Sequence, residues 1–511
     1  MSFRSILFAR SDDGAEKLAV ETPECFADLN LDQVVDAIVA GREQYNLKPF
    51  FYTPLSDLDS ITYRHEVMRE LENKSLFACV ESFAAKMRAM RQHLAQAEKL
   101  YYKLQKQSWF LDAVEIYCDA VVALLGDLSR VELKSRGFLD VREYLAAHTG
   151  SDRFVALQAE TKKLQADLAT IRYSMLIKND RVTVRKYQGE ADVSVEVDAT
   201  FAKFKQGAVR DYHAKFANPP EMNHIEANVL EGVRQLYPEI FSDLDGYCAR
   251  NGPYLDHVIE VFDREIQFYI AYLEQVGKFK RAGLKFCYPK VSDQDKGVVN
   301  HEGFDLALAY KLLNGHATVV CNDFYLAGKE RIIVVTGPNQ GGKTTFARTF
   351  GQLHFLASLG CPVPGRQARL FLFDRIFTHF EKEENIKDLR GKLEDDLHRI
   401  RNILDRIGPN SIVIINEIFN STTSRDALFL SKKIVARLLE LDLLCVCVTF
   451  LDELASMSEK IVSMASTVVP ENPSLRTFKI LRKPADGLAF AISIAEKYRL
   501  TYRWLKERIK P

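Results

Sequence analysis

Apolar side chains recur every three or four residues along much of the first half of the chain. This spacing is present from about residue 50 to 180, for example at 83–90 and 154–158, and it returns at 254–280. A repeat near 3.6 residues places the apolar side chains on one side of a helix. The region is therefore predicted to be all-α. Its last run should form one long amphipathic helix that starts at the Asn-Gly-Pro run of 251–253 and serves as a lever or packs against the earlier helices.

Two short segments interrupt this helical spacing. Apolar and polar residues alternate at 181–185 and again at 193–197, and a Gln-Gly-Glu run at 188–190 lies between them. Strict alternation is typical of a strand with one buried face. The pattern predicts a small β-hairpin made of these two segments.

The pattern changes again from about residue 300 onward. Runs at 331–335, 411–415 and 443–448, apolar apart from the first residue of the first two, alternate with helical segments. Strands buried on both faces of a parallel sheet have this character. The polar stretch at 291–297 is predicted to link this last domain to the helical region. The expected fold is therefore mixed, with an all-α region and small hairpin followed by an α/β domain.

Composition narrows the function classes. Lys+Arg and Asp+Glu both number 69, so the net charge gives no support for nucleic-acid binding and any such surface must be local. The nine cysteines include no CxxC pair, which disfavours a disulfide framework or a zinc site. Cys445 and Cys447 alternate within an apolar run that is typical of a buried strand. No segment approaches the ~20 apolar residues of a membrane span, so a cytoplasmic protein without a membrane partner is expected.

A glycine-rich segment carries the clearest chemistry. Residues 337–344 fit the pattern G-x-x-x-x-G-K-[ST], directly after an apolar strand and before a helical run. Glycines let backbone N–H groups close around phosphate oxygens, and the N-terminus of the following helix adds its dipole. Lys343 would supply positive charge to the terminal phosphates, and the Thr344 hydroxyl would ligate Mg²⁺.

A nucleoside triphosphatase also needs an acidic pair after a second strand. The candidate pair is Asn416-Glu417, which follows the apolar run at 411–415. Glu417 stands in the place of the general base. Asn416 offers an amide oxygen where a carboxylate is expected, so it brings no negative charge and should bind the metal more weakly.

These motifs together resemble the MutS family. The run 336–345, TGPNQGGKTT, is very similar to that family's TGPNMGGKST loop, and Pro338-Asn339 makes it more specific than a generic P-loop. The likeness continues through 360–364 and 374–378, and through Asn416-Glu417-Ile418 with 421–424, which resembles DEIGRGTST. It covers most of 318–500. Upstream, the residues at 52–55 and 63–67 look like the start of the family's helical core.

The resemblance implies a domain plan and a set of site residues. It divides the chain into a short N-terminal segment at 1–50, a helical core and lever at 51–298 with a clamp-like insertion near 180–250, and a MutS-type, ABC-like P-loop ATPase domain at 299–511. Val319 and Val320 would flank the adenine, and Thr344 and Asn416 would hold Mg²⁺. Glu417 and Lys343 would be catalytic. The nucleotide-binding residues would be Gly337, Pro338, Asn339, Gln340, Gly341, Gly342, Lys343, Thr344, Thr345, Val319 and Val320.

The family also implies partners. Its members work as dimers with composite ATP sites and sense DNA mismatches or unusual DNA structures, so a homodimer, structure-specific DNA binding and cooperation with repair or recombination proteins are expected here. Basic residues near the hairpin and lever would contact the DNA. They are Lys178, Arg181, Arg185, Lys186, Lys203, Lys205, Lys278, Lys280 and Arg281.

Several positions depart from the family pattern. The first 50 residues are too few for a mismatch-reading domain, no Phe-x-Glu occurs in the chain, and no nuclease extension like that of some relatives follows the ATPase domain. Gly391 and Lys392 replace a Ser-Thr pair that reaches the partner's γ-phosphate. Phe450 replaces a histidine that senses the nucleotide. With Asn416, these changes leave open whether bound ATP is hydrolysed.

Two functions remain open on the sequence. One is a MutS-like ATPase that acts as an ATP-dependent clamp on branched or distorted DNA. The other is an ATP-gated scaffold that regulates a protein partner with slow or no hydrolysis. A DNA-organising ATPase of the ABC cassette kind would need an LSGGQ-like signature, which the sequence lacks.

Overall fold

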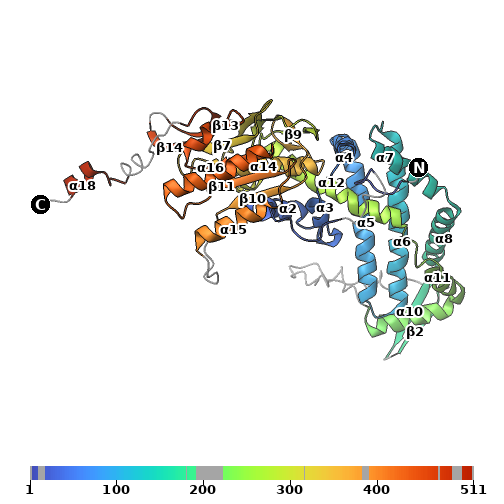
Figure 1. The fold of residues 1–511 in the computed structure, drawn as a ribbon. Coiled ribbons are helices and arrows are strands. Elements are labelled where there is room, and N and C mark those ends of the chain that lie inside the picture. The colour runs from blue at the N-terminus through green and yellow to red at the C-terminus, as the bar shows by residue number, and fades with distance from the viewer. Residues whose placement is uncertain are drawn as a thin grey trace. The chain divides into compact units, whose positions relative to one another are not determined.

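The computed structural model describes residues 3–9, 18–179, 181–190, 222–315, 317–381, 391–469, 472–485 and 498–508. The chain divides into two compact units (Figure 1). The helical unit contains Met1–Phe3, Asn73–Leu133 and Leu139–Asp263, and the sheet unit contains Arg4–Glu72, Lys134–Phe138 and Arg264–Pro511. Among the described helices, none is both long enough and apolar enough to cross a membrane.

A pair of long helices forms the centre of the helical unit. α5 (Lys74–Lys99) packs along α6 (Lys103–Arg130). The buried residues of α5 recur at helical spacing and include Leu76, Val80, Phe83, Met87 and Met90, which confirms the helical prediction for this region. The unit also holds most of α7 (Arg136–Thr149), α8 (Asp152–Ala169), α10 (His224–Leu236), α11 (Pro238–Arg250) and the first turns of α12 (His257–Arg281).

The hairpin is present, but one of its strands differs from the prediction. β1 (Tyr173–Lys178) pairs antiparallel with β2 (Arg181–Lys186), so the segment at 181–185 is a strand as predicted. Its partner precedes it in the chain, and the predicted partner at 193–197 lies outside the described residues. Asn179 has φ +57°, the left-handed conformation that a tight hairpin turn needs and that asparagine tolerates. This turn was overlooked in favour of the glycine at 189.

The long helix is confirmed, with a later start. α12 begins at His257 rather than at the Asn-Gly-Pro run of 251–253. The Asp256 carboxylate accepts hydrogen bonds from the backbone N–H groups of Val258 and Ile259, at 3.0 and 3.1 Å. An aspartate that satisfies free N–H groups at a helix start is a strong N-cap, so it sets the boundary here.

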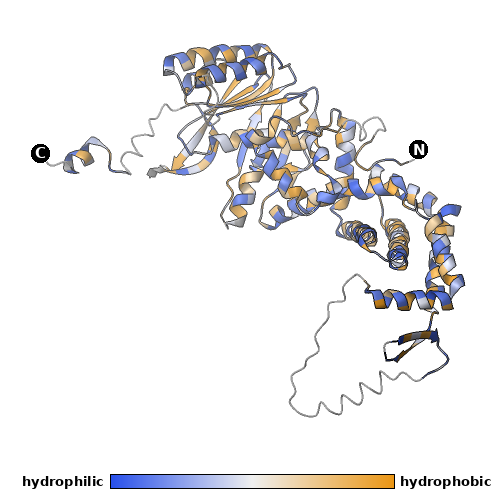
Figure 2. Cartoon of the chain, turned by 90° about the horizontal axis from the view of Figure 1, so that it is seen from below, coloured by the Kyte–Doolittle hydropathy of each residue, from blue (hydrophilic) through white to orange (hydrophobic). Residues whose placement is uncertain are grey.

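A six-stranded sheet forms the core of the sheet unit, in the order β10-β11-β12-β7-β13-β14. The first five strands are parallel and β14 is antiparallel to β13. The apolar runs of the sequence are its central strands, and Figure 2 shows them as largely hydrophobic. Its strands are β7 (Ile332–Thr336), β10 (Ile376–Phe380), β11 (Ile412–Asn416), β12 (Leu444–Val448), β13 (Ile461–Val469) and β14 (Asn472–Arg482).

Helices bury both faces of this sheet. Val413 and Ile415 of β11 pack with residues of α15 (Lys392–Leu404) and α16 (Ser424–Glu440) on one face. Ile414 points to the other face, where α14 (Lys343–Ser358) contacts β11. Cys445 and Cys447 are buried in β12, as the apolar alternation predicted. The mixed α/β class with a sheet of mainly parallel strands is therefore confirmed.

A second, four-stranded sheet has the order β4-β9-β5-β6. The polar stretch 291–297, predicted as a link between domains, contains the end of β4 and the connection to β5, and both strands pair with β9. The stretch forms a connection within one sheet instead. The strands are β4 (Lys290–Ser292), β5 (Val298–Gly303), β6 (Asn322–Leu326) and β9 (Gln367–Phe371), while β3 (Phe286–Cys287) pairs with β8 (Val363–Pro364). The remaining short elements are α13 (Leu306–Asn314), η4 (Asp452–Ser456) and α18 (Tyr502–Arg508).

N-terminal helices pack against α14 in the same unit. Arg348 and Gln352 of α14 donate hydrogen bonds to the carbonyls of Asp28 and Leu29, both at 2.8 Å. A Cβ atom on Gly351 would lie 2.8 Å from Leu29 and 2.6 Å from Ile414, so only glycine permits this close approach. The N-terminal elements are α1 (Phe26–Leu29), α2 (Leu31–Val39), η3 (Glu43–Tyr45), α3 (Lys48–Tyr52) and α4 (Leu58–Leu71).

A buried glutamate holds the first residues of the sheet unit. Glu265 of α12 accepts hydrogen bonds from the Ser5 hydroxyl (2.8 Å) and the Ile6 backbone N–H (2.9 Å). Arg64 donates to the Leu7 carbonyl at 3.0 Å. Burial raises the pKa of Glu265 to about 7, and the two donated hydrogen bonds oppose that rise.

This glutamate should make stability depend on pH. The pKa of Glu265 in the folded protein lies above the ordinary value of 4.5. Its contribution to the free energy of unfolding is therefore fully present below pH 4.5 and is lost as the pH rises through about 7. Glu265→Gln should reduce this loss by on the order of 1–3 kcal/mol. Urea unfolding of both proteins across this pH range measures the difference. Glu260→Gln, at an exposed position of the same helix, is the control, and equal pH slopes for wild type and Glu265→Gln would contradict the prediction.

Candidate functional site

The carboxyl ends of three parallel strands meet at one edge of the six-stranded sheet. β12 lies between β7 and β11. Beyond the strand ends, the Thr449 N–H donates to the Val335 carbonyl (3.1 Å) and the Glu417 N–H donates to the Val448 carbonyl (2.9 Å). The glycine-rich loop, the Asn416-Glu417 pair and Phe450 follow these strand ends, so the fold brings together three segments that are distant in sequence.

The glycine-rich loop joins β7 to α14, in the strand–loop–helix context that the motif predicted. Three of its residues have a left-handed backbone: Gly337 at φ +114°, Gln340 at +57° and Gly342 at +90°. Gly342 is the N-cap of α14, so the first turn of the helix begins directly at Lys343. The N–H groups of a first helical turn have no partner within the helix, which makes this end a favourable place for an anion.

Strand β13 supports the loop from one side. The Ser466 hydroxyl donates to the Gly341 carbonyl at 3.0 Å. A Cβ atom on Gly341 would lie 2.0 Å from that hydroxyl oxygen, and one on Gly337 would lie 3.0 Å from the Ser466 Cβ. Arg476 of β14 donates to the Asn339 carbonyl at 3.2 Å. No sequence motif pointed to Ser466, because it lies within an otherwise unremarkable apolar strand.

The Lys343 ammonium lies inside the loop. Its Nζ donates to the carbonyls of Gly337 (2.9 Å) and Pro338 (3.3 Å), and it is 3.7 Å from Oε1 of Glu417. The Phe450 ring centroid is 4.0 Å from Nζ, and the lysine is only 4% exposed. Burial lowers the pKa of Lys343, and the Glu417 carboxylate opposes that change. Phe450, the aromatic residue that replaces the family's histidine, thus packs its ring against the ammonium of Lys343.

The two predicted metal-binding residues lie side by side. The Thr344 hydroxyl donates to Oδ1 of Asn416 at 2.9 Å, and Asn416 is buried at the end of β11. Hydroxyl and amide oxygens are suitable ligands for Mg²⁺, so this pair fits the ion, although it carries no negative charge. Glu417, at φ +55°, supplies the nearest carboxylate and also accepts a hydrogen bond from Asn420 at 3.4 Å.

The predicted base-flanking valines are half-buried and precede β6. Val319 lines a hollow of about 680 Å³ together with Lys278 and Phe279 of α12 and Tyr310 and Leu313 of α13. The role of the valines as adenine contacts stays a prediction.

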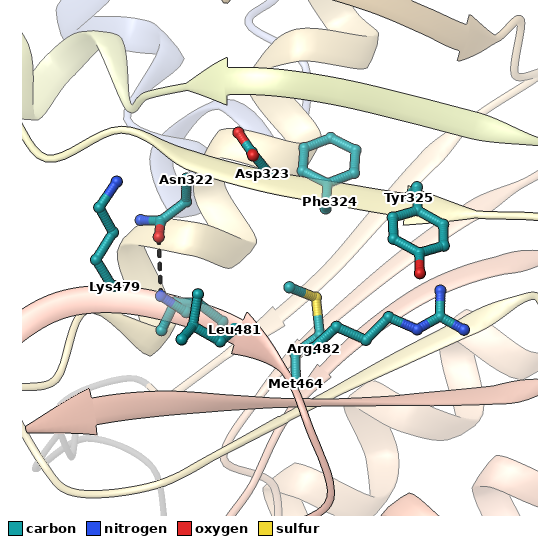
Figure 3. A pocket seen from close by; sticks show the side chains of 9 residues that line it. Asn322, Asp323, Phe324, Tyr325, Met464, Lys479, Leu481 and Arg482 are labelled. Carbon is teal, nitrogen blue, oxygen red and sulfur yellow. Dashed lines mark hydrogen bonds between the residues drawn. The ribbon is translucent and has the colours of Figure 1, made fainter.

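The start of β6 is connected to the loop through β14. Asn322 donates to the Phe478 carbonyl (3.1 Å) and accepts from the Ile480 N–H (2.8 Å), a bond drawn in Figure 3. Phe478 has φ +58° and is 48% exposed. Its backbone carbonyl oxygen would lie 3.6 Å from a Cβ atom on Gly342. At the other end of the same strand pair, Figure 3 shows Arg482 reaching toward Tyr325, and its guanidinium lies 4.2 Å from the ring centroid. Phe478 is an exposed aromatic beside the loop that the motif search missed.

The other departures lie at the start of α15. Gly391 is the N-cap of this helix, and Lys392 pairs with Glu381 after β10. Arg390 of the same run lies outside the described residues. The structure leaves their role at a partner's phosphate untested.

The part of the chain that carries this site also matches known proteins. The family model for MutS domain V matches residues 333–503. DNA mismatch repair protein MutS of Syntrophomonas wolfei subsp. wolfei is 26% identical over 291 residues, which is 55% of this chain and 33% of that protein. The DNA mismatch repair protein MutS of Chlorobium phaeobacteroides is 25% identical over 293 residues, which is 55% of this chain and 31% of that protein. The protein of the same name from Pseudothermotoga lettingae is 24% identical over 277 residues, which is 53% of this chain and 32% of that protein.

The fold and the loop thus define a mixed α/β protein with a glycine-rich strand–loop–helix junction at the edge of a mainly parallel sheet. The comparisons confirm the resemblance that the loop motif predicted: residues 333–503 match the model for MutS domain V, and about half of the chain is similar to DNA mismatch repair protein MutS. The chain spans about a third of the length of the curated relatives it matches.

The contact between the loop and Ser466 gives a test of the site's geometry. Gly341→Ala places a methyl group where the Ser466 hydroxyl lies, so the loop or β13 must shift. We expect a loss of about 1–3 kcal/mol in the free energy of unfolding, measured by urea denaturation. Gly252→Ala, where a Cβ meets no atom within 4 Å, serves as the matched control. If Gly341→Ala unfolds at the same urea concentration as this control, the close packing described for the loop is wrong.

Proposed function

We propose that this protein is an ATP-binding, MutS-like clamp that acts on branched or distorted DNA in a process related to mismatch repair. The observation that carries the proposal is the glycine-rich loop at the start of α14, with Lys343 directed into it. We further propose that the protein works as a cytoplasmic homodimer and cooperates with repair or recombination proteins, as its similarity to MutS proteins suggests.

Nucleotide binding would use residues of the loop and the helix start. The backbone of Gly337 to Gly342 and the first turn of α14 would surround the phosphates, and Thr345 lies in that same turn. Lys343 would exchange its carbonyl and Glu417 partners for phosphate oxygens. The exposed ring of Phe478, close to the loop and tied to the residues after Val319 and Val320, is available to the base.

The metal and the hydrolytic water would lie on the β11 side of the loop. Thr344 and Asn416 would hold Mg²⁺, which neutralises developing phosphate charge. Glu417 would orient and deprotonate the attacking water, and it must leave the Lys343 ammonium to do so. The site therefore supports hydrolysis only after this ion pair opens.

DNA contact is proposed for two basic regions. In the helical unit, Lys178, Arg181, Arg185 and Lys186 belong to the hairpin. In the sheet unit, Lys278, Lys280 and Arg281 end α12, although Lys280 already pairs with Glu72 at 3.0 Å. Lys203 and Lys205 lie outside the described residues. The hairpin is the stronger candidate because its strands are mostly exposed.

A specific observation also favours the second candidate function, an ATP-gated scaffold that controls a protein partner. Asn416 places a neutral amide against Thr344, and the Phe450 ring covers the motif lysine. Both features favour retention of the nucleotide over rapid cleavage, because they withhold charge from the reacting phosphate.

Measurement of ATP binding and turnover separates the two candidates. Asn416→Asp should raise turnover by about tenfold or more, because a carboxylate adds a charged ligand for Mg²⁺. Lys343→Ala should weaken ATP binding at least about tenfold. Asn410→Asp, which makes the same charge change at an exposed position before β11, is the control. Rapid turnover by wild type that Asn416→Asp does not increase would exclude an impaired metal site.

DNA binding is tested by gel shift with duplex, bubble and junction DNA over a range of salt concentrations. Wild type should bind the bubble and junction more tightly than the duplex. Arg181→Gln and Arg185→Gln should each weaken binding to all three and lower the slope of log affinity against log salt by about 1. Lys163→Gln, an exposed lysine of α8, is the control. Absence of binding at low salt to every DNA would leave the scaffold as the surviving candidate.

A further inference from the structure

The β1–β2 hairpin has two chemically different faces. In its register, Met175 lies opposite Val184 and Ile177 lies opposite Val182, so these four side chains share one face. The opposite face carries the pair Lys178 and Arg181 and the pair Ser174 and Arg185, with Leu176 and Thr183 between them. The pair Tyr173 and Lys186 lies at the inner end of the first face, so that face is apolar toward the turn, and the opposite face is mainly basic.

Among the residues that the structure describes, those of α10 and Tyr237 cover only the inner part of the apolar face. A Cβ atom on Gly232 of α10 would lie 3.3 Å from Val184, and the Lys186 ammonium lies 5.0 Å from the Tyr237 ring centroid. Toward the turn, Ile177 is 69% exposed and Met175 is 52% exposed. Together with Val182, these residues form an apolar tip, which is the name used for them below.

The apolar tip exposes three neighbouring apolar side chains to water, and this exposure is unfavourable in free energy. Burial of large apolar side chains is favourable in water, so such a tip favours a partner that accepts it. The charge around the tip limits what that partner can be. The described charged residues of the two strands are all basic, and the described acid Glu190, which follows them, interacts with Ser174 and Arg185 at the end away from the turn.

We propose that the apolar tip is a wedge that enters unstacked base steps of DNA while the basic face contacts the phosphates beside it. Isoleucine and methionine are among the side chains that proteins insert between base steps, and the energetic cost of unstacking is lowest where pairing is already interrupted. The inference rests on the proposed DNA-binding function and adds a preference for DNA with an unstacked base step. The ligand is duplex DNA with a bulge or a similar unstacked step.

Two other occupants fit less well. A second copy of the chain would bring the same basic residues against this hairpin, and like charges repel. An anionic lipid surface would match the charges, but an exposed tip of three residues at the end of a narrow ribbon offers little apolar area for a bilayer. Nucleic acid combines the negative charge with apolar base faces.

The test compares binding of a fluorescent duplex and of the same duplex with a central bulge to the full chain. Wild type should prefer the bulged DNA. Ile177→Ser and Met175→Ser should each reduce this preference, and their combination should reduce it about tenfold, while affinity for the plain duplex stays nearly unchanged. Ile177→Leu should retain the preference, because it preserves apolar volume. Exposure of these positions keeps the risk of unfolding low, and circular dichroism checks it.

The hairpin itself offers the matched control. Leu176 is 54% exposed on the basic face, next to Ile177 in the chain. Leu176→Ser therefore makes a comparable change without touching the apolar tip, and it should leave the preference for bulged DNA intact. If Leu176→Ser and Ile177→Ser lose the preference for bulged DNA equally, the assignment of the wedge to the apolar face is overturned.

The outcomes separate this inference from the proposed function. Wild type that binds neither DNA refutes DNA binding itself. Wild type that prefers bulged DNA, with Ile177→Ser and Met175→Ser equal to it, refutes only the wedge. Loss of self-association in Ile177→Ser by analytical ultracentrifugation, or loss of binding to phosphatidylserine vesicles with DNA preference unchanged, also overturns the wedge and assigns the tip to a second copy or to lipid.

Discussion

The parallel alignment of β7, β11 and β12 is the constraint on which the candidate site depends. Their carboxyl ends lie level, and hydrogen bonds beyond the strand ends tie Glu417 to Val448 and Thr449 to Val335. Buried strands of this kind have little freedom to shift, because helices cover both faces. The loop, the Asn416-Glu417 pair and Phe450 therefore meet at one edge with a fixed spacing, and the chemistry of the site follows from what each strand delivers there.

The environment of Lys343 connects this geometry with function. Two carbonyls, a carboxylate and an aromatic ring surround its ammonium, and each of them competes with a phosphate for the same charge. In the proposed function, nucleotide binding and release of Glu417 would be linked steps, since this carboxylate would become available as the general base when the lysine changes partner. Such a link would tie the opening of the ion pair to the presence of nucleotide in the loop.

Close contacts in the sheet unit show why some residue choices are strict. Gly351 allows α14 to lie against both Ile414 and Leu29, and Gly341 allows the loop to rest on Ser466. Through Arg348 and Gln352, α14 also holds the carbonyls of α1. The helix that begins at the site is thus packed between the sheet and the N-terminal helices.

The sequence alone predicted the helical region, the apolar strands and the glycine-rich loop, because these depend on local periodicity or on a motif with defined spacing. It also singled out Thr344 and Asn416, which the structure brings into hydrogen-bond contact, and their role as metal ligands stays a prediction. It missed the hairpin strand at 173–178, since the Asn179 turn is a weaker local signal than a glycine. The 291–297 stretch was mistaken for a linker because polarity does not distinguish a loop within a sheet from one between domains. The tertiary structure alone revealed Ser466, Phe478 and the ring of Phe450 over Lys343, because contacts between distant segments leave no periodic trace in the sequence.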